Sequence, residues 1–180
     1  MKTKFTFLLF LLPLFYFTAC KKESAEQFGT EKISARLTDT AAASGNYEAI
    51  NIDVRNVEVR IAGSTGGDWH SIHTTTGIYN LLQLSGGIDM LLANDVLPSG
   101  QLSQLRLTLG DNNSVKKDGV LFPLNLSETE KNKLTIDLNE PADKSTIDLR
   151  FEFNAEQSVE LSGSGYSLHP VFSVLGNQHP

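Results

Sequence analysis

Two histidines have a spacing that is common among metal ligands. His70 and His73 are three residues apart. In an extended strand, however, residues three apart face opposite sides of the sheet. A zinc site also needs three or four protein ligands, and no third ligand accompanies this pair. We therefore predict that neither histidine holds a metal and that both lie on the surface of a strand or turn.

A second group of polar residues has the oxygen atoms that calcium prefers. Asp111, Asn112 and Asn113 are consecutive, and Asp118 lies nearby. Calcium takes about six to eight oxygen ligands, often from alternating positions in one loop. That alternating Asp-x-Asp-x-Asp-Gly pattern is absent, and Asn and Asp are also common in ordinary turns. We predict a plain turn and leave open whether calcium binds near Asp111.

The single tryptophan, Trp69, has two interpretations. A tryptophan on a strand of an all-β protein usually packs into the core, because its large apolar ring gains most from burial. The alternative is an exposed platform that stacks against a sugar, together with Tyr47 or Tyr79. No second aromatic residue is present at position 71 to widen such a platform, so the pattern favours the core.

The sequence contains no recognised catalytic motif. It has no Gly-x-Ser-x-Gly elbow, no phosphate-binding glycine loop and no His-Glu-x-x-His pair. Acidic residues such as Asp148 and Glu152 alternate with apolar residues, which is typical of the solvated face of a strand. We predict no catalytic residue, no cofactor and no metal. A hydrolase whose site is assembled from distant residues is the alternative.

Cys20 is the only cysteine, and it follows a distinctive amino-terminal segment. Lys2 and Lys4 precede an apolar run over residues 5–17, and two small residues then lead to the cysteine. A basic start, a short apolar stretch and a small-residue exit predict a secretory signal peptide over residues 1–19. The run is too short for a comfortable transmembrane helix, which needs about 20 residues.

The phrase Phe17-Thr18-Ala19-Cys20 resembles the lipobox of bacterial lipoproteins, although Phe17 replaces the usual aliphatic residue. The resemblance implies cleavage before Cys20, a diacylglycerol on its sulfur and a further acyl chain on the new amino terminus. Several acyl chains hold a protein on a membrane nearly permanently. Residues 20–31 are then a lipidated cysteine and flexible tether, and its start, Lys21-Lys22-Glu23, is partly similar to the export signals of Bacteroidetes-type lipoproteins.

Charge and cysteine content limit what the remaining domain can be. Loss of Lys2 and Lys4 leaves 13 of the 15 basic residues against 21 acidic residues, a formal net charge of −8. This balance disfavours nucleic acid, whose phosphates attract basic surfaces. With Cys20 lipidated, no cysteine remains for a disulfide, so the hydrophobic core alone must stabilise the domain.

From residue 33 onward the dominant period of the apolar residues is two, which predicts strands with one buried face. The parity changes between Val54 and Val57, which predicts a β-bulge or a bend. Asp118-Gly119, between Val115 and Val120, predicts a tight hairpin because glycine accepts positive φ.

The leucine-rich stretch around residues 78–97 loses the strict alternation, so we predict a long, partly helical connection there. The expected fold is all-β: an antiparallel β-sandwich of about eight or nine strands over residues 32–176.

The order of several phrases then resembles a family of bacterial lipoprotein domains known only as a domain of unknown function. These phrases run from Tyr79-Asn80-Leu81-Leu82 through Leu97-Pro98-Ser99-Gly100 and Asp111-Asn112-Asn113 to Tyr166-Ser167-Leu168-His169-Pro170. The likeness covers residues 33–175. It implies an exported all-β sandwich domain and no known reaction.

These observations together predict a non-enzymatic, membrane-anchored module of the cell envelope that binds a protein or glycan. Its lipid would attach at Cys20 and hold it at the outer membrane, with the periplasmic and surface faces both open. A structural or adhesive surface component is the second hypothesis, in which sheet edges engage neighbouring molecules. A hydrolase is the third.

Overall fold

The computed structural model describes residues 30–40, 46–62, 69–98, 100–132, 134–140 and 146–176. The expected signal peptide and Cys20 lie outside the described residues. The first strand begins at Thr30, so the last two residues of the segment expected to be a tether are part of this strand. No helix in the described ranges is long and apolar enough to cross a membrane.

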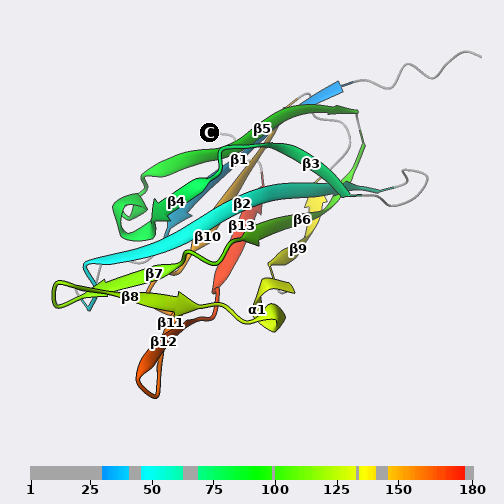
Figure 1. The fold of residues 1–180 in the computed structure, drawn as a ribbon. Helices are drawn as coiled ribbons and strands as arrows, with labels where there is room; N and C mark the ends of the chain where they lie inside the picture. Colours follow the sequence, from blue (N-terminus) through cyan, green and yellow to red (C-terminus); the bar gives the residue numbers. More distant parts are fainter. Residues whose placement is uncertain are drawn as a thin grey trace, which may run out of the picture.

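Strands account for most of the described chain (Figure 1). They are β1 (Thr30–Asp39), β2 (Ala49–Ile61), β3 (Trp69–Thr74), β4 (Gly77–Asn80), β5 (Asp89–Pro98), β6 (Leu102–Leu109), β7 (Ser114–Lys117), β8 (Val120–Asn125), β9 (Thr135–Glu140), β10 (Thr146–Phe153), β11 (Val159–Ser162), β12 (Gly165–Leu168) and β13 (Phe172–Gly176). The helical elements are the 3-10 helix η1 (Leu81–Leu84) and the short α1 (Glu128–Asn132). The predicted all-β class is confirmed.

The alternation seen in the sequence determines which side chains form the core. In β10, Ile147, Leu149, Phe151 and Phe153 are buried, and the polar residues between them are not. Phe153 also stacks on Phe172 of β13, with 5.4 Å between ring centroids. A residue fully buried in such a core contributes about 1.5–3 kcal/mol through the loss of its apolar surface from water.

The strands form one curled, mixed sheet instead of the predicted antiparallel sandwich. In the described residues the sheet has 13 strands, with the main order β11-β12-β8-β7-β2-β3-β5-β1-β10-β13. Two neighbouring pairs are parallel: β1 with β10, and β12 with β8. Alternation indicates which face of a strand is buried, but it says nothing about the direction of the neighbour, so the parallel pairs were not predicted.

The curl encloses a single core. In Figure 1, β1, β10 and β13 run behind β2 and β6, and buried residues from both parts belong to one apolar cluster. The hairpin predicted at Asp118-Gly119 is confirmed: it joins β7 to β8, and φ is +51° and +76° at its two central residues. Two positive φ values in succession define a type I′ turn, which matches the twist of the strands.

The prediction of a long, partly helical connection over residues 78–97 is not confirmed. Only η1 is helical there, and the rest of the stretch is mostly β4 and β5. A β-bulge explains why β5 cannot be recognised from the alternation of apolar residues. Ala35 of β1 pairs with Ala93, while Arg36 pairs with Leu91, so Leu92 is an extra residue. Leu92 and Ala93 are consequently buried in succession, which breaks the alternation.

The bulge predicted in β2 is confirmed. Val54 pairs with Leu109 of β6, and Asn56 pairs with Thr108, so Arg55 is the extra residue. After this bulge Val57 and Val59 face the core, and the side chains between them face outward. The bulge therefore determines which residues of the second half of β2 reach solvent.

Candidate functional site

Four outward-facing side chains form a continuous row across the sheet. Trp69 of β3 pairs with Arg60 of β2, Arg60 pairs with Gln104 of β6, and Gln104 pairs with Asp137 of β9. We call these four residues the Arg60 row. Neighbouring strands are about 4.8 Å apart, so the row is about 14 Å long. Its members come from four strands, and only the strand register brings them together.

A hollow opens in the sheet surface at the row. Between Leu102 and Gln104, β6 has one extra residue relative to β2, so Ser103 is a bulge residue there, and the pairing of β6 with β9 is irregular at the same place. Bulges often occur beside functional sites because they redirect a side chain or interrupt the pairing. The hollow has a volume of about 510 Å³. It is lined by Arg60, Ala62, Gln101, Ser103, Gln104, Asp137 and Leu138.

Hydrogen bonds orient the side chains of the row but leave some of their donors and acceptors unused. Arg60 Nη1 donates to Gln104 Oε1 at 3.1 Å, and Gln104 Nε2 donates to Asp137 Oδ1 at 2.9 Å. Arg has five N–H donors and a carboxylate has about four acceptor positions, so most of the capacity at both ends remains. Donors therefore lie at one end of the hollow and acceptors at the other.

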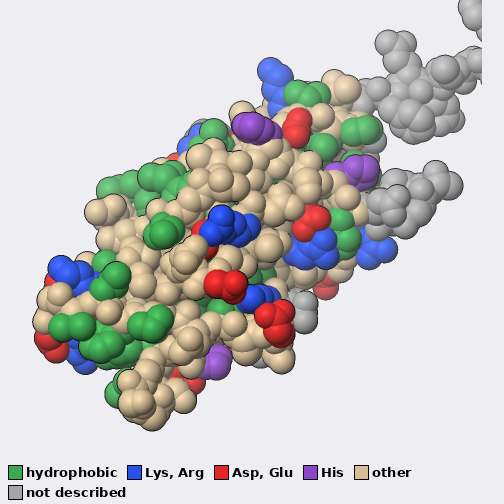
Figure 2. All heavy atoms as spheres, in the orientation of Figure 1, with side chains coloured by type: hydrophobic (Ala, Val, Ile, Leu, Met, Phe, Trp, Pro, Cys, Tyr) green, Lys and Arg blue, Asp and Glu red, His purple; other side chains and the backbone are tan. Residues whose placement is uncertain are grey.

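A second pair of charges lies beside the row. Arg106 Nε and Nη2 both donate to Glu58 Oε2 at 2.8 Å, and the Arg106 guanidinium lies 4.2 Å from the centre of the Trp69 ring. Figure 2 shows basic and acidic side chains next to one another over β6 and the adjoining part of β2. Arg106 thus covers one face of Trp69 and neutralises Glu58, which stiffens this side of the row.

The interpretation of Trp69 as a core residue is wrong. The ring is half-buried and does not belong to the apolar cluster. Ile72, three residues further along β3, is the residue that enters the core, and residues three apart in a strand face opposite sides. Neither tyrosine considered for a sugar-stacking platform belongs to the row. Tyr79 is buried, and its hydroxyl donates to Thr75 O, whereas Tyr47 packs edge-on against Tyr166.

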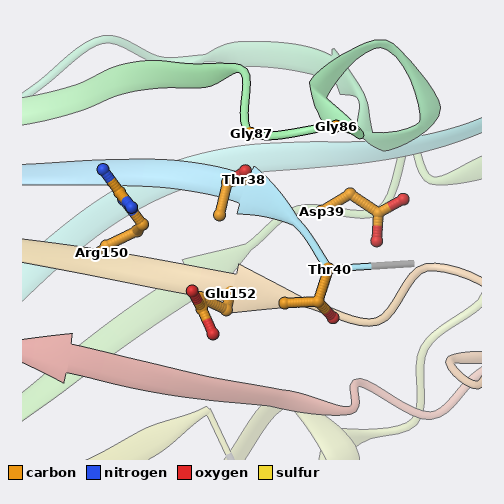
Figure 3. Close-up of a pocket in the computed structure, with 7 residues that line it drawn as sticks. All are labelled: Thr38, Asp39, Thr40, Gly86, Gly87, Arg150 and Glu152. Carbon is orange, nitrogen blue, oxygen red and sulfur yellow. The ribbon is translucent and has the colours of Figure 1, made fainter. Parts of the chain in front are cut away.

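A second hollow, of about 360 Å³, lies at the carboxyl end of β1 (Figure 3). Thr38, Asp39, Thr40, Gly86, Gly87, Arg150 and Glu152 line it. Figure 3 shows that the Arg150 and Glu152 side chains point in opposite directions and that the Asp39 carboxylate points away from both. Arg150 is also bound to Asp89, which holds Arg36 on its other oxygen. These groups do not converge, so this hollow is the weaker candidate.

The residues considered for metal binding have other contacts. His73 is exposed and pairs with β5, whereas His70 is half-buried and pairs with β2. The Asp111 carboxylate accepts a hydrogen bond from Lys131 at 2.9 Å, and this contact lowers the pKa of Asp111 below its ordinary value. Within the described ranges, no group of three or more His, Cys, Asp or Glu residues is arranged to hold a metal ion.

The neighbours of Asp111 bind within the protein. Asn112 donates from its backbone and side-chain nitrogens to Asp53 Oδ2, at 3.2 and 3.1 Å. Asn113 accepts from Asp53 N at 2.9 Å and donates to Gly110 O at 2.7 Å. The turn that we considered for calcium therefore fastens the β6–β7 connection to β2.

Sequence reasoning did not identify Arg60, Gln104 or Asp137. Arg60 and Asp137 lie between apolar residues of predicted strands, and Gln104 directly precedes the alternating Leu105, Leu107 and Leu109, so the alternation marks all three as outward-facing. Many other polar residues share this pattern. The missing information was the register, which the sequence does not display.

The fold and the site together define an all-β domain with a polar row of side chains on the outer face of a curled sheet. The chain belongs to the family described as Domain of unknown function (DUF4382), whose model matches residues 30–170. No curated protein and no solved structure matches the chain.

Proposed function

We propose that this protein is a lipid-anchored module of the cell envelope that binds a glycan at the Arg60 row. The observation that carries the proposal is the row itself, in which Arg60, Gln104 and Asp137 line a hollow with donors and acceptors of unused capacity, and the Trp69 ring lies on the strand next to Arg60. We assign it binding and not catalysis, because Arg106 holds the Glu58 carboxylate, so Glu58 is not available to act with Asp137 as a catalytic pair.

A glycan fits this chemistry better than an apolar ligand does. Sugar hydroxyls both donate and accept, so a pair of neighbouring hydroxyls can accept from Arg60 and donate to Asp137. The hollow is lined mostly by polar side chains, and its volume is within the range of about 300–1,000 Å³ for small-ligand sites. A protein partner would instead need a larger apolar centre on this face.

A glycan array tests the proposal. The full-length protein, purified in detergent, is expected to give saturable binding that falls at least about tenfold, or about 1.4 kcal/mol, in Gln104→Ala, because this variant releases the Arg60 and Asp137 side chains that Gln104 orients. Thr108→Ala is the matched control, because Thr108 is exposed on β6 with the same outward parity, beyond the row. Equal binding by the two variants would contradict the assignment of the site.

The anchoring part of the proposal rests on Cys20 and the apolar segment before it. Lipidation would place the β1 end of the domain nearest the bilayer, because β1 follows the segment after Cys20. The expected location is the outer membrane, on either of its faces.

Anchoring is tested separately from glycan binding. Cys20→Ala is expected to abolish labelling by radioactive fatty acid and to move the protein out of the membrane fraction. Unchanged fractionation would refute a lipid anchor, and protease treatment of intact cells would distinguish the surface face from the periplasmic face.

A further inference from the structure

Arg60 differs from the other arginines that the structure describes. Arg36 and Arg150 bind Asp89, Arg55 binds Asp53, and Arg106 binds Glu58. Arg60 donates only to the neutral side-chain oxygen of Gln104 among the described residues. Its positive charge is therefore the one among these five that no carboxylate of the described chain compensates.

The immediate neighbours of Arg60 leave this charge in place. Its two cross-strand partners, Trp69 and Gln104, are both neutral. Asp137 is two strands away, and it meets Arg60 only through Gln104, whose side-chain nitrogen donates to Asp137 Oδ1 at 2.9 Å. Glu58 lies on the same face of β2, but Arg106 neutralises it. Among the described residues, Arg60 thus presents to the polar hollow a guanidinium that has no carboxylate partner.

Resting on the proposed function, we infer that the ligand is an acidic glycan whose anionic group binds Arg60. A guanidinium presents parallel N–H donors that match the two oxygens of a carboxylate or a sulfate, and such charge-assisted pairs are among the stronger hydrogen bonds. Gln104 holds the guanidinium in place, which lowers the entropy that is lost on binding.

The overall charge of the chain supports a local binding site for the anionic group. The formal net charge is −6, so the molecule as a whole repels acidic polymers. Binding of an acidic glycan therefore cannot result from general electrostatic attraction and requires a local positive site. Asp137 at the far end of the row can accept hydrogen bonds from sugar hydroxyl groups.

The test compares pairs of probes that differ in one kind of anionic group. Homogalacturonan oligosaccharides are compared with the same oligosaccharides after methyl esterification, and chondroitin sulfate with desulfated chondroitin, on an array that also carries neutral glycans. For at least one of the two pairs, the charged form is expected to bind the full-length protein about ten- to a hundredfold more tightly. The pair that shows the difference identifies the anion as carboxylate or sulfate.

Variants assign this preference to Arg60. Arg60→Ala and Arg60→Gln are expected to remove the preference for the charged form, while Arg60→Lys keeps part of it because the charge remains without the paired donors. A far-ultraviolet circular dichroism melt checks that each variant folds. Thr108→Ala should keep the full preference.

The outcomes separate the two proposals. Binding of glycans with no preference for the charged form overturns the acidic ligand and leaves the proposed function in place. A preference that persists in Arg60→Gln overturns the role of Arg60. Absence of binding to every glycan on the array overturns the proposed function itself.

Discussion

The polar side chains in the two halves of β2 differ in how many of their hydrogen bonds are made within the protein. Asp53, before the bulge, is buried, and its Oδ2 accepts from Arg55 and from both nitrogens of Asn112. Arg60, after the bulge, is half-buried and has one neutral partner. A polar group whose contacts are all made within the protein stabilises the fold, whereas one with unused capacity at a hollow can bind a ligand.

The cluster around Asp53 is tightly packed. Gly110 N donates to Asp53 O at 2.7 Å, and a Cβ atom added at Gly110 would lie 2.6 Å from Arg55 Nε. There is no room for a ligand or for a larger residue. Variants that affect stability and ligand binding separately therefore test the contrast between this cluster and the Arg60 row.

The largest effect is expected from Asp53→Ala. Loss of the carboxylate removes the acceptor for two Asn112 donors and leaves Arg55 without its partner, which should lower the free energy of unfolding by about 2–4 kcal/mol. Arg55 is 52% exposed and can return to water, which keeps the loss below that of a fully buried pair. Urea unfolding measures this, and a change below about 0.5 kcal/mol would show that the cluster is not structural.

A somewhat smaller effect is expected from Gly110→Ala. The new Cβ would approach the Asp53 carboxylate and the Arg55 guanidinium too closely, and overpacking of this kind costs about 1–3 kcal/mol. Gly165→Ala is the control, because a Cβ at Gly165 meets no atom within 4 Å. The comparison fails if the two variants melt at the same temperature.

Trp69→Ala should have a still smaller effect on stability. The ring is half-buried on the outer face, so the loss is its contact with Arg106 and part of its apolar area, about 1 kcal/mol. Leu105→Ala, which empties a fully buried position of β6, should cost about 2–5 kcal/mol. Equal losses of unfolding free energy in the two variants would show that Trp69 is a core residue. Weaker glycan binding in Trp69→Ala alone would support a role of Trp69 in the site.

The smallest effect is expected from Asp111→Asn, and it depends on pH. Lys131 lowers the pKa of Asp111 below 3.8, so the ion pair stabilises the fold above that pH and the contribution disappears as the pH falls through the lowered pKa. Asp111→Asn should therefore melt slightly below the unaltered protein at neutral pH and together with it in strong acid. A difference that grew on acidification would contradict this sign.

Several features were predictable because they depend on neighbouring residues. The alternation in β10, the turn at Asp118-Gly119 and the bulge in β2 each leave a local pattern. β5 was not predictable, because the bulge at Leu92 buries two consecutive residues and imitates a non-strand pattern. Trp69 was wrongly assigned to the core, although Ile72 lies three residues further along the same strand and must face the opposite side.

The sequence by itself determined the all-β class and the outward direction of Arg60, Gln104 and Asp137, because the face that a side chain occupies follows from the twofold period of a strand. Only the tertiary structure decided that these three residues are neighbours. Their contact depends on the register of three strands, and that register is set by bulges at Arg55 and Ser103 and by hydrogen bonds between segments far apart in the chain. A shift by one residue would turn these side chains to the other face, so the site exists only in the assembled sheet.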